Sequence, residues 1–553
     1  MSAYYRTLAG ADSDRTFQLQ TQVDEANGNI VSLPFRGTAN TSFTVYWDDT
    51  GNVSNTYTHD GSVISATHTY ASNANVTIRV QGDMGRFDYG TLSGTEQDRF
   101  ISLDRWGNVT YIADQNASFV SHVTSDFYSW EILALDYPNL PANANCSSMF
   151  LRQRGYARPG NYGAFEQRNF YTDGVSGLGW PSKVTSNIVN LSGAFREAFE
   201  PDTIGLVGAN MTTATLNGWD VSNVTDMSYC FYKSYYLGSL SNWNTSNVTN
   251  MESMFQSNGD PRPFEQGYTG IFGNYYNKPE LPGIENWDTS NVTNMKRIFH
   301  LATLYKANVS TWDTSNVTTL EGAFQASVGY SHANNNSFSN WNVSNVTNMA
   351  DTFGMVFYFV APFQPYGVLA CGMGEVDLGN WDTINVANMR HIMNSFGNGG
   401  LKSPNIDGWN VSNVTNMHGA FGGNFFGSTT SDANIVMDPS GWNTANLSIA
   451  SNTFIRNRVL DSNLGGWNLS SITTMEHMLD DCAMSTENYS RTLIGWANFV
   501  SGNSDLPASI TLGAANLTYS NVTYGTGTYT DAVSARAYLT GTAGWTINGD
   551  SQV

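Results

Sequence analysis

The stretch NWNTSNVTNMESMF (residues 242–255) returns with few changes as NWDTSNVTNMKRIF (286–299) and NWNVSNVTNMADTF (340–353). Alignment on its tryptophan gives nine copies, spaced by 24 to 44 residues. The aligned tryptophans are Trp219, Trp243, Trp287, Trp312, Trp341, Trp381, Trp409, Trp442 and Trp467. A period in this range is typical of solenoids, whose units stack because none of them can bury its apolar face alone.

Each copy carries apolar residues at fixed offsets from its tryptophan, which we number as position 0. Position −3 is apolar except in the copy of Trp442, position +5 is Val, Leu or Ile, +8 is Met or Leu except at Ala450, and +12 is Phe in seven copies. Such offsets put +5, +8 and +12 on one face of a helix. Position +6 is threonine in most copies, and Thr249 with Glu252 matches a capping box. We therefore predict a short strand ending at the tryptophan and a helix of about two turns after NVT.

The strict register predicts that the tryptophans form the core of the stack. Burial of one tryptophan removes about 150–250 Å² from water, which contributes about 4–6 kcal/mol before entropy is subtracted. The alternative is an exposed aromatic ladder that grips carbohydrate, but binding residues need not keep step with aliphatic ones. The asparagine at +4 fits a turn, and its amide is expected to form a ladder from copy to copy. These asparagines are Asn223, Asn247, Asn291, Asn316, Asn345, Asn385, Asn413 and Asn446.

The consensus W-[DN]-[TV]-S-N-V-T-x-M-x-x-x-F resembles that of the BspA-type, or DUF285-type, leucine-rich-repeat family of bacterial surface proteins. Its nine copies cover about residues 210–484. More degenerate copies extend upstream, since NLSGAF (190–195) parallels TLEGAF (319–324) and ISLDRWGNVTYI (101–112) resembles the opening repeat of the family. The resemblance implies a solenoid over residues 84–484.

The two ends of the chain differ from the repeats. Alternation of apolar and polar residues within 17–83 predicts antiparallel strands, and VYWDDTGN with THTYASNANVTIRVQG resembles a PKD-like β-sandwich. Residues 1–16 fit neither pattern and are expected to be an arm that docks in an assembly. Residues 485–553 contain two helical patterns and are expected to be an α+β cap, because the end of a repeat core must be covered.

Long inserts rich in Gly, Pro, Tyr and Phe interrupt the repeats at 256–283, 354–377 and 398–405. In solenoids such insertions form loops on one face, often the binding face. The apolar stretch MVFYFVAPF (355–363) either packs on the repeats or meets another chain. The aromatic candidates for an interaction surface are Tyr268, Tyr275, Tyr276, Phe357, Tyr358, Phe359, Phe363 and Tyr366.

Composition limits the classes of partner. The chain has 553 residues, of which 41% are hydrophobic and only 13% charged, with a net charge of −21. This length exceeds one compact core, and the negative charge disfavours nucleic acid. No run of about 20 apolar residues would insert in a membrane. The four cysteines, about 80–140 residues apart, suit free thiols better than a disulfide framework or a zinc site.

No motif for catalysis, a cofactor or a metal stands out in the sequence. His391, His418 and His477 fall at +9 or +10 of their copies, which the predicted helix places on its exposed surface. We therefore expect a protein that is not an enzyme and has no catalytic, cofactor-binding or metal-binding residues.

The predicted fold is an α/β repeat solenoid of the leucine-rich-repeat kind, with a short strand and a short helix per unit, an N-terminal all-β sandwich and a C-terminal α+β cap. The first residues lack the apolar region of a signal peptide, and the scarce charge suits a virion protein. We expect a structural and adhesive appendage of a phage particle, of the tail-fibre or head-fibre type, within an oligomeric assembly. Its N-terminal region would contact other virion or surface proteins, and its repeats a host protein or glycan. The alternative is a bacterial cell-surface adhesin, which the family resemblance by itself favours.

Overall fold

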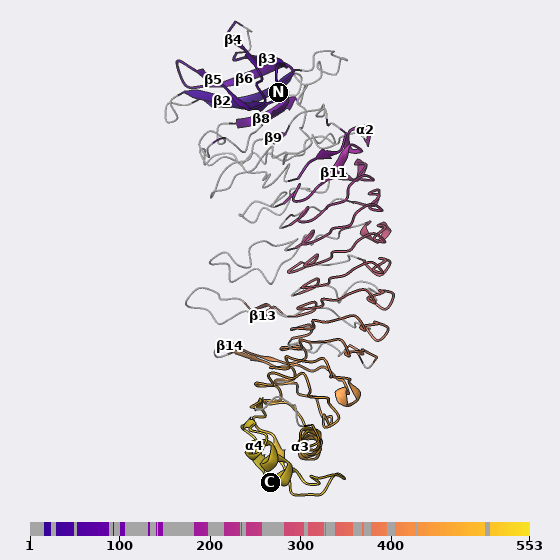
Figure 1. The fold of residues 1–553 in the computed structure, drawn as a ribbon. Helices are drawn as coiled ribbons and strands as arrows, with labels where there is room; N and C mark the ends of the chain where they lie inside the picture. Colours follow the sequence, from indigo (N-terminus) through magenta and orange to yellow (C-terminus); the bar gives the residue numbers. More distant parts are fainter. Residues whose placement is uncertain are drawn as a thin grey trace, which may run out of the picture. The chain divides into compact units, whose positions relative to one another are not determined.

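The computed structural model of the chain divides into two compact units, Met1–Val248 and Thr249–Val553. Figure 1 labels their helices and strands. The structure describes residues 16–23, 29–48, 52–87, 92, 100–105, 131–132, 140, 142–147, 182–196, 215–232, 234, 239–256, 281, 283–302, 308–325, 327, 338–354, 356–357, 368–369, 378–394, 404–406, 408–426, 429–503 and 509–553.

The first unit contains a β-domain of two sheets. Its strands are β1 (Phe17–Val23), β2 (Ile30–Arg36), β3 (Ser42–Tyr46), β4 (Ser54–Thr58), β5 (Val63–Thr69), β6 (Ala74–Gly82), β7 (Arg86–Phe87), β8 (Phe100–Arg105) and β9 (Glu131–Ile132). One sheet has the order β4-β3-β6-β1-β8-β9 and the other the order β5-β2-β7. All pairs are antiparallel except β8 with β9. The buried rings of Phe17, Phe35, Phe43 and Phe87 form its core, with neighbouring centroids 5.0–5.9 Å apart.

The sheets of this β-domain include strands that come after residue 83. Strand β7 pairs with β2, and β8 pairs with β1. The described part of the stretch predicted as an opening repeat, residues 101–105, therefore lies in a sheet of the β-domain. The PKD-like assignment stays a prediction. Among the residues that suggested it, Trp47 is buried, the His68 ring stacks on it at 5.3 Å, and the Tyr70 hydroxyl donates to the Trp47 carbonyl at 2.7 Å.

The segment after NVT forms turns, so the helix prediction that we drew from the apolar offsets is wrong. In the copy of Trp341, the amide of Ala350 donates to the Asn348 side chain at 3.0 Å, and the amide of Thr352 closes a tight turn on the Met349 carbonyl. Asp351, between them, has a φ of 58°. A left-handed residue interrupts a right-handed helix. Spacing alone could not reveal this, because two successive turns carry apolar residues at the same three- and four-residue offsets.

The segment before the tryptophan also differs from the prediction. A 3-10 helix occupies it in three copies, as η4 (Thr215–Gly218), η6 (Ile284–Asn286) and η7 (Pro439–Gly441), where we predicted a strand. The amide of each following tryptophan closes a turn, as Trp287 does on the Ile284 carbonyl at 3.2 Å. The chain thus bends at the tryptophan, and each copy is a series of turns.

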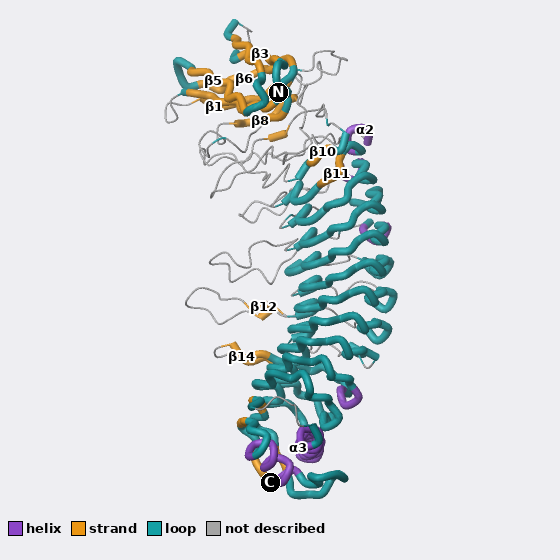
Figure 2. Tube along the Cα trace, in the orientation of Figure 1, coloured by secondary structure: helices purple, strands orange, loops and turns teal. Residues whose placement is uncertain are grey.

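Figure 2 shows successive copies within residues 249–484 as stacked loops. Backbone hydrogen bonds join them. The amides of Arg297 and Phe299 donate to the carbonyls of Glu321 and Ala323 at 2.8 and 2.9 Å. Successive parallel bridges link Asn250, Asn294, Thr319, Asn348, Asn388, Asn416, Ile449 and Thr474. Each copy is therefore one layer, in register with the next.

The tryptophans add side-chain bonds between layers. Eight of the nine are at most 4% exposed, while Trp442 is half-buried. The indole Nε1 donates to the carbonyl at −3 of the preceding copy over 2.7–3.1 Å. The pairs are Trp243 with Leu216, Trp312 with Ile284, Trp341 with Val309, Trp381 with Phe338, Trp409 with Leu378 and Trp467 with Pro439. The indole thus buries apolar area and satisfies a backbone acceptor.

The +4 side chains form the ladder that their position suggested. Their Nδ2 donates to the carbonyl at +3 of the preceding copy over 2.7–2.9 Å. The donors are Asn223, Asn247, Asn316, Asn345, Asn385, Asn413 and Asn446. In the last copy Ser471 replaces asparagine, and its hydroxyl donates to the Ala445 carbonyl at 2.6 Å.

The C-terminal residues cover the last layer. Helix α3 (Thr486–Ser501) begins at the N-cap Ser485 and contains Trp496, whose indole donates to the Leu464 carbonyl at 2.8 Å. This bond repeats the contact of the repeat tryptophans. Helix α4 (Ala532–Gly541) packs on α3, and the strands are β16 (Thr511–Gly513), β17 (Thr518–Tyr519), β18 (Thr546–Asn548) and β19 (Ser551–Gln552). A parallel bridge between Met475 and Leu512 joins this cap to the layers.

The remaining short elements come before the copy of Trp219 or between two copies in the sequence. They are β10 (Ala144–Asn145), α2 (Ser182–Thr185), β11 (Ile188–Asn190), β12 (Val356–Phe357), β13 (Val368–Leu369), β14 (Asn424–Phe426) and β15 (Thr429–Ser431). The upstream stretch NLSGAF behaves as a layer, because Asn190 bridges to Asp226 and the Gly193 amide donates to the Ser228 carbonyl at 2.7 Å.

Candidate functional site

Position +10 has a left-handed backbone in all nine copies, with φ between 49° and 63°. The residues there are Tyr229, Ser253, Arg297, Gly322, Asp351, His391, Gly419, Asn452 and His477. Since the conformation is constant while the side chain varies, this position displays a different group in each layer. Together with its neighbour +9, it forms what we call the variable column.

From the copy of Trp287 to the copy of Trp381, the variable column carries paired charges. Lys296 Nζ lies 3.0 Å from a Glu321 carboxylate oxygen. Asp351 lies 3.5 Å from the Arg390 guanidinium and 3.4 Å from His391 Nδ1. These ion pairs join neighbouring layers, and being partly exposed each contributes about 0–1 kcal/mol.

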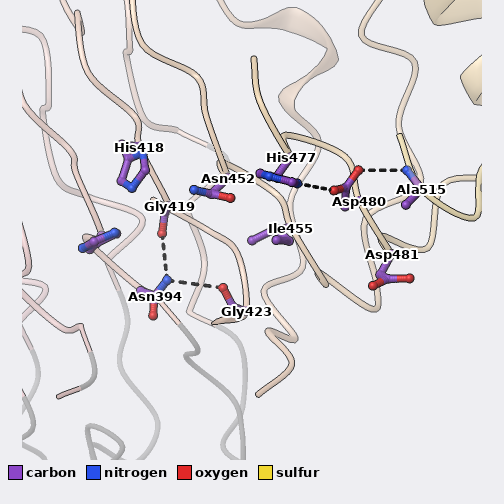
Figure 3. A pocket seen from close by; sticks show the side chains of 11 residues that line it. Asn394, His418, Gly419, Gly423, Asn452, Ile455, His477, Asp480, Asp481 and Ala515 are labelled. Carbon is purple, nitrogen blue, oxygen red and sulfur yellow. Dashed lines mark hydrogen bonds and ion pairs between the residues drawn. The ribbon is translucent and has the colours of Figure 1, made fainter. Parts of the chain in front are cut away.

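The variable column then opens into a groove of about 640 Å³ (Figure 3). One end is lined by His391, Asn394, His418 and Gly419, the middle by Gly423, Asn452 and Ile455, and the other end by His477, Asp480, Asp481 and Ala515. The groove therefore spans four layers and reaches the cap. Its volume lies within the range of about 300–1,000 Å³ that small-molecule sites have.

The first end of the groove contains two imidazoles in contact. The rings of His391 and His418 have centroids 5.0 Å apart and planes at 53°. Burial lowers the pKa of His418, and the nearby His391 and Arg390 lower it further. His418 is therefore held neutral at pH 7, with one ring nitrogen as donor and the other as acceptor.

A glycine shapes this end. At Gly419 an added Cβ would lie 2.3 Å from His391 Cδ2, so a side chain there would have to displace that ring. Asn394, which is 5% exposed, donates from Nδ2 to the carbonyls of Gly419 and Gly423 at 3.3 and 3.4 Å. The buried amide fixes the backbone that forms the floor.

The other end contains carboxylates that already have partners. Asp480 Oδ2 lies 2.6 Å from His477 Nδ1, and Asp480 Oδ1 accepts from the Ala515 amide at 2.8 Å. Asp481 accepts from the Asn516 amide group and lies 3.6 Å from the Arg456 guanidinium. These contacts reduce the negative charge that this end offers to a ligand.

The structure places the three histidines differently from the prediction. We expected them on exposed helix surfaces. All three lie at turn positions and line the groove; His477 is exposed, as expected, whereas His391 and His418 are partly buried. A sequence signal was available in their shared register at +9 and +10 and in Gly419, which directly follows His418. This signal can be interpreted only once the left-handed turn at +10 is known, and the predicted helix does not contain that turn.

Of the aromatic candidates in the inserts, Phe357 lies in β12, whose backbone alone is described. The other seven lie outside the described residues. Three cysteines, Cys146, Cys230 and Cys482, are buried free thiols whose pKa values burial raises. Within the described ranges, no cluster of His, Cys, Asp and Glu could hold a metal ion, and no helix is long and apolar enough to cross a membrane.

We expect His300, at +13 of the copy of Trp287, to make stability depend on pH. Burial first, and then the charge of Arg297, lowers its pKa to about 4. The unfolded chain, with a histidine pKa of about 6.5, binds more protons, so stability falls as pH drops from about 6.5 to about 4. Over that range His300 should account for a loss of about 2–3 kcal/mol.

Urea unfolding at pH 7 and pH 4.5 of the native chain and of His300→Gln measures this effect. The glutamine variant should lose less stability than the native chain on acidification. Equal losses in the two proteins would contradict the assignment to His300, since other titrating groups are common to both.

The chain is a repeat protein whose layers are tied by indole, amide and backbone hydrogen bonds and whose variable column carries a groove. A family model described as "Mycoplasma protein of unknown function, DUF285" matches residues 190–269, 266–370 and 368–492. The chain belongs to this family, as the tryptophan motif indicated. No curated protein and no solved structure matches it.

Proposed function

We propose that the chain is a non-enzymatic structural and adhesive protein, built as a leucine-rich-repeat-like solenoid that presents a binding face on an extracellular surface. The observation that carries the proposal is the contrast between constant and variable positions. The tryptophan and the +4 asparagine bond layer to layer, while +9 carries residues as different as Lys296, Ala350 and His418. A constant scaffold with a changing surface suits recognition.

Two settings fit this role. We propose a phage virion appendage of the tail-fibre or head-fibre type, supported by a surface that relies on amides and hydroxyls, with only 13% charged residues. The alternative, a bacterial cell-surface adhesin, is supported by membership of a family known from Mycoplasma. In either setting the N-terminal region would attach to other virion or surface proteins, and the repeats would bind a host protein or glycan.

Two measurements test this proposal. Mass spectrometry should find the chain in virions purified from lysed cultures of the source, whereas the adhesin alternative expects it in the cell-envelope fraction. The purified, fluorescently labelled full chain should also bind the surface of target cells in a saturable way. A chain confined to the cytosol that binds no cells would overturn both settings.

A further inference from the structure

We propose that the groove on the last four repeats binds an uncharged oligosaccharide. This inference rests on the proposed adhesive function and assigns it a site and a ligand class. The groove differs from the rest of the variable column in the state of its polar groups. Ion pairs such as Lys296 with Glu321 fill the earlier layers. Carboxylates also face His391 and His477 at the groove, but His418 and Asn452 add imidazole and amide groups that are in no ion pair.

The charges around the groove favour a ligand without net charge. An anion would approach Asp480 and Asp481 and a protein of net charge −21. A cation would find both carboxylates already engaged, Asp480 by His477 and Asp481 by Arg456. Replacing such a partner costs the cation much of the attraction that a free carboxylate would offer.

The hydrogen-bonding groups of the groove favour hydroxyls. The ring nitrogens of His418 and the side-chain amide of Asn452 have no hydrogen-bond partner among the described residues, and both line the groove. Each offers a donor and an acceptor. A sugar hydroxyl also donates and accepts, so it can satisfy either group in either orientation.

The floor of the groove suits the carbon face of a sugar ring. Gly419 and Gly423 line the groove without a side chain, and Ile455 and Ala515 add small apolar surfaces. Figure 3 shows Asn452 and Ile455 between the histidine end and the aspartate end of the groove. With layers about 4.8 Å apart, four of them provide about 14 Å, which is longer than one sugar ring and suits a short chain.

The test uses the cells that the labelled full chain binds. Their surface polysaccharide is extracted, freed of protein with protease, and divided by anion exchange into an uncharged and an anionic fraction. We expect the uncharged fraction to compete with cell binding and the anionic fraction to have no effect. Competition only by the anionic fraction, or loss of binding after protease treatment of the cells, would overturn the proposal.

Two variants locate the site. His418→Ala removes one donor and one acceptor from the groove and should weaken binding of the uncharged fraction by about fivefold to tenfold. Val522→Ala truncates an exposed side chain of the cap, outside both the variable column and the groove, and should leave binding unchanged. If His418→Ala keeps full affinity while the chain still binds cells, the groove assignment fails and the adhesive function stands. If the labelled chain binds no cells, both the groove assignment and the adhesive function fail.

Discussion

The Trp341→Ala variant is expected to lose about 3–5 kcal/mol of unfolding free energy, the usual cost of removing a large core aromatic. Trp341 is 2% exposed, its ring stacks on Trp381 at 6.4 Å with planes 5° apart, and its Nε1 donates to the Val309 carbonyl at 3.0 Å. The change therefore opens a cavity and leaves a backbone acceptor unpaired. Because the same ring contacts the next layer, neighbouring layers should loosen together.

Urea unfolding measures the loss, and amide hydrogen exchange of the layers at Trp312 and Trp381 measures the spread. Trp442→Ala is the matched control, because Trp442 occupies the same position but is only half-buried. It should cost clearly less than Trp341→Ala. An unchanged unfolding midpoint in Trp341→Ala would show that the indole is not part of a packed core.

Replacing Gly495 by alanine should dislodge the cap. Gly495 lies in α3, and a Cβ added there would meet the Cα and the carbonyl oxygen of Gly465 at 2.4 Å. Contacts that short are with backbone, which cannot swing aside as a flexible side chain does. Overpacking of this kind costs about 1–3 kcal/mol and should shift α3 away from the last layer, breaking the bond between Trp496 and Leu464.

The same substitution at Gly541 is a control, because it should not lower the stability of the chain. Gly541 ends α4, and no atom lies within 4 Å of an added Cβ. Gly541→Ala should therefore be neutral or stabilise the chain by up to about 1 kcal/mol. Near-ultraviolet circular dichroism and thermal unfolding distinguish the two variants. Equal unfolding temperatures for both would contradict the close approach of α3 to the last layer.

The repeat itself is largely legible in the sequence, because its positions are fixed by contacts that only certain residues can make. The tryptophans and the +4 asparagines keep their register since each must reach a carbonyl in the preceding copy. The family resemblance follows from the same residues, and the family model confirms it. The serine at 471 shows that a hydroxyl can replace the amide where the reach is similar.

The local conformation and the groove were not predictable by the same means. Asn348 and Asp351 specify turns through an Asx contact and a left-handed backbone, but apolar spacing in the same segment matches a helix. The groove requires residues of four successive layers, each 25 or more positions from the next along the chain, namely His391, His418, Asn452 and His477. Their proximity follows from stacking geometry, which a linear pattern does not contain.

The bonds between layers have a consequence for how this protein can change over time. The bonds that recur from copy to copy use positions from about −3 to +14, and the remainder of each copy varies so much that tryptophans lie 24 to 44 residues apart. An insertion outside that span lengthens one connection at a small entropic cost and leaves the contacts of adjacent copies intact. New recognition segments can thus be acquired or lost without refolding the scaffold, which favours rapid diversification against a changing target.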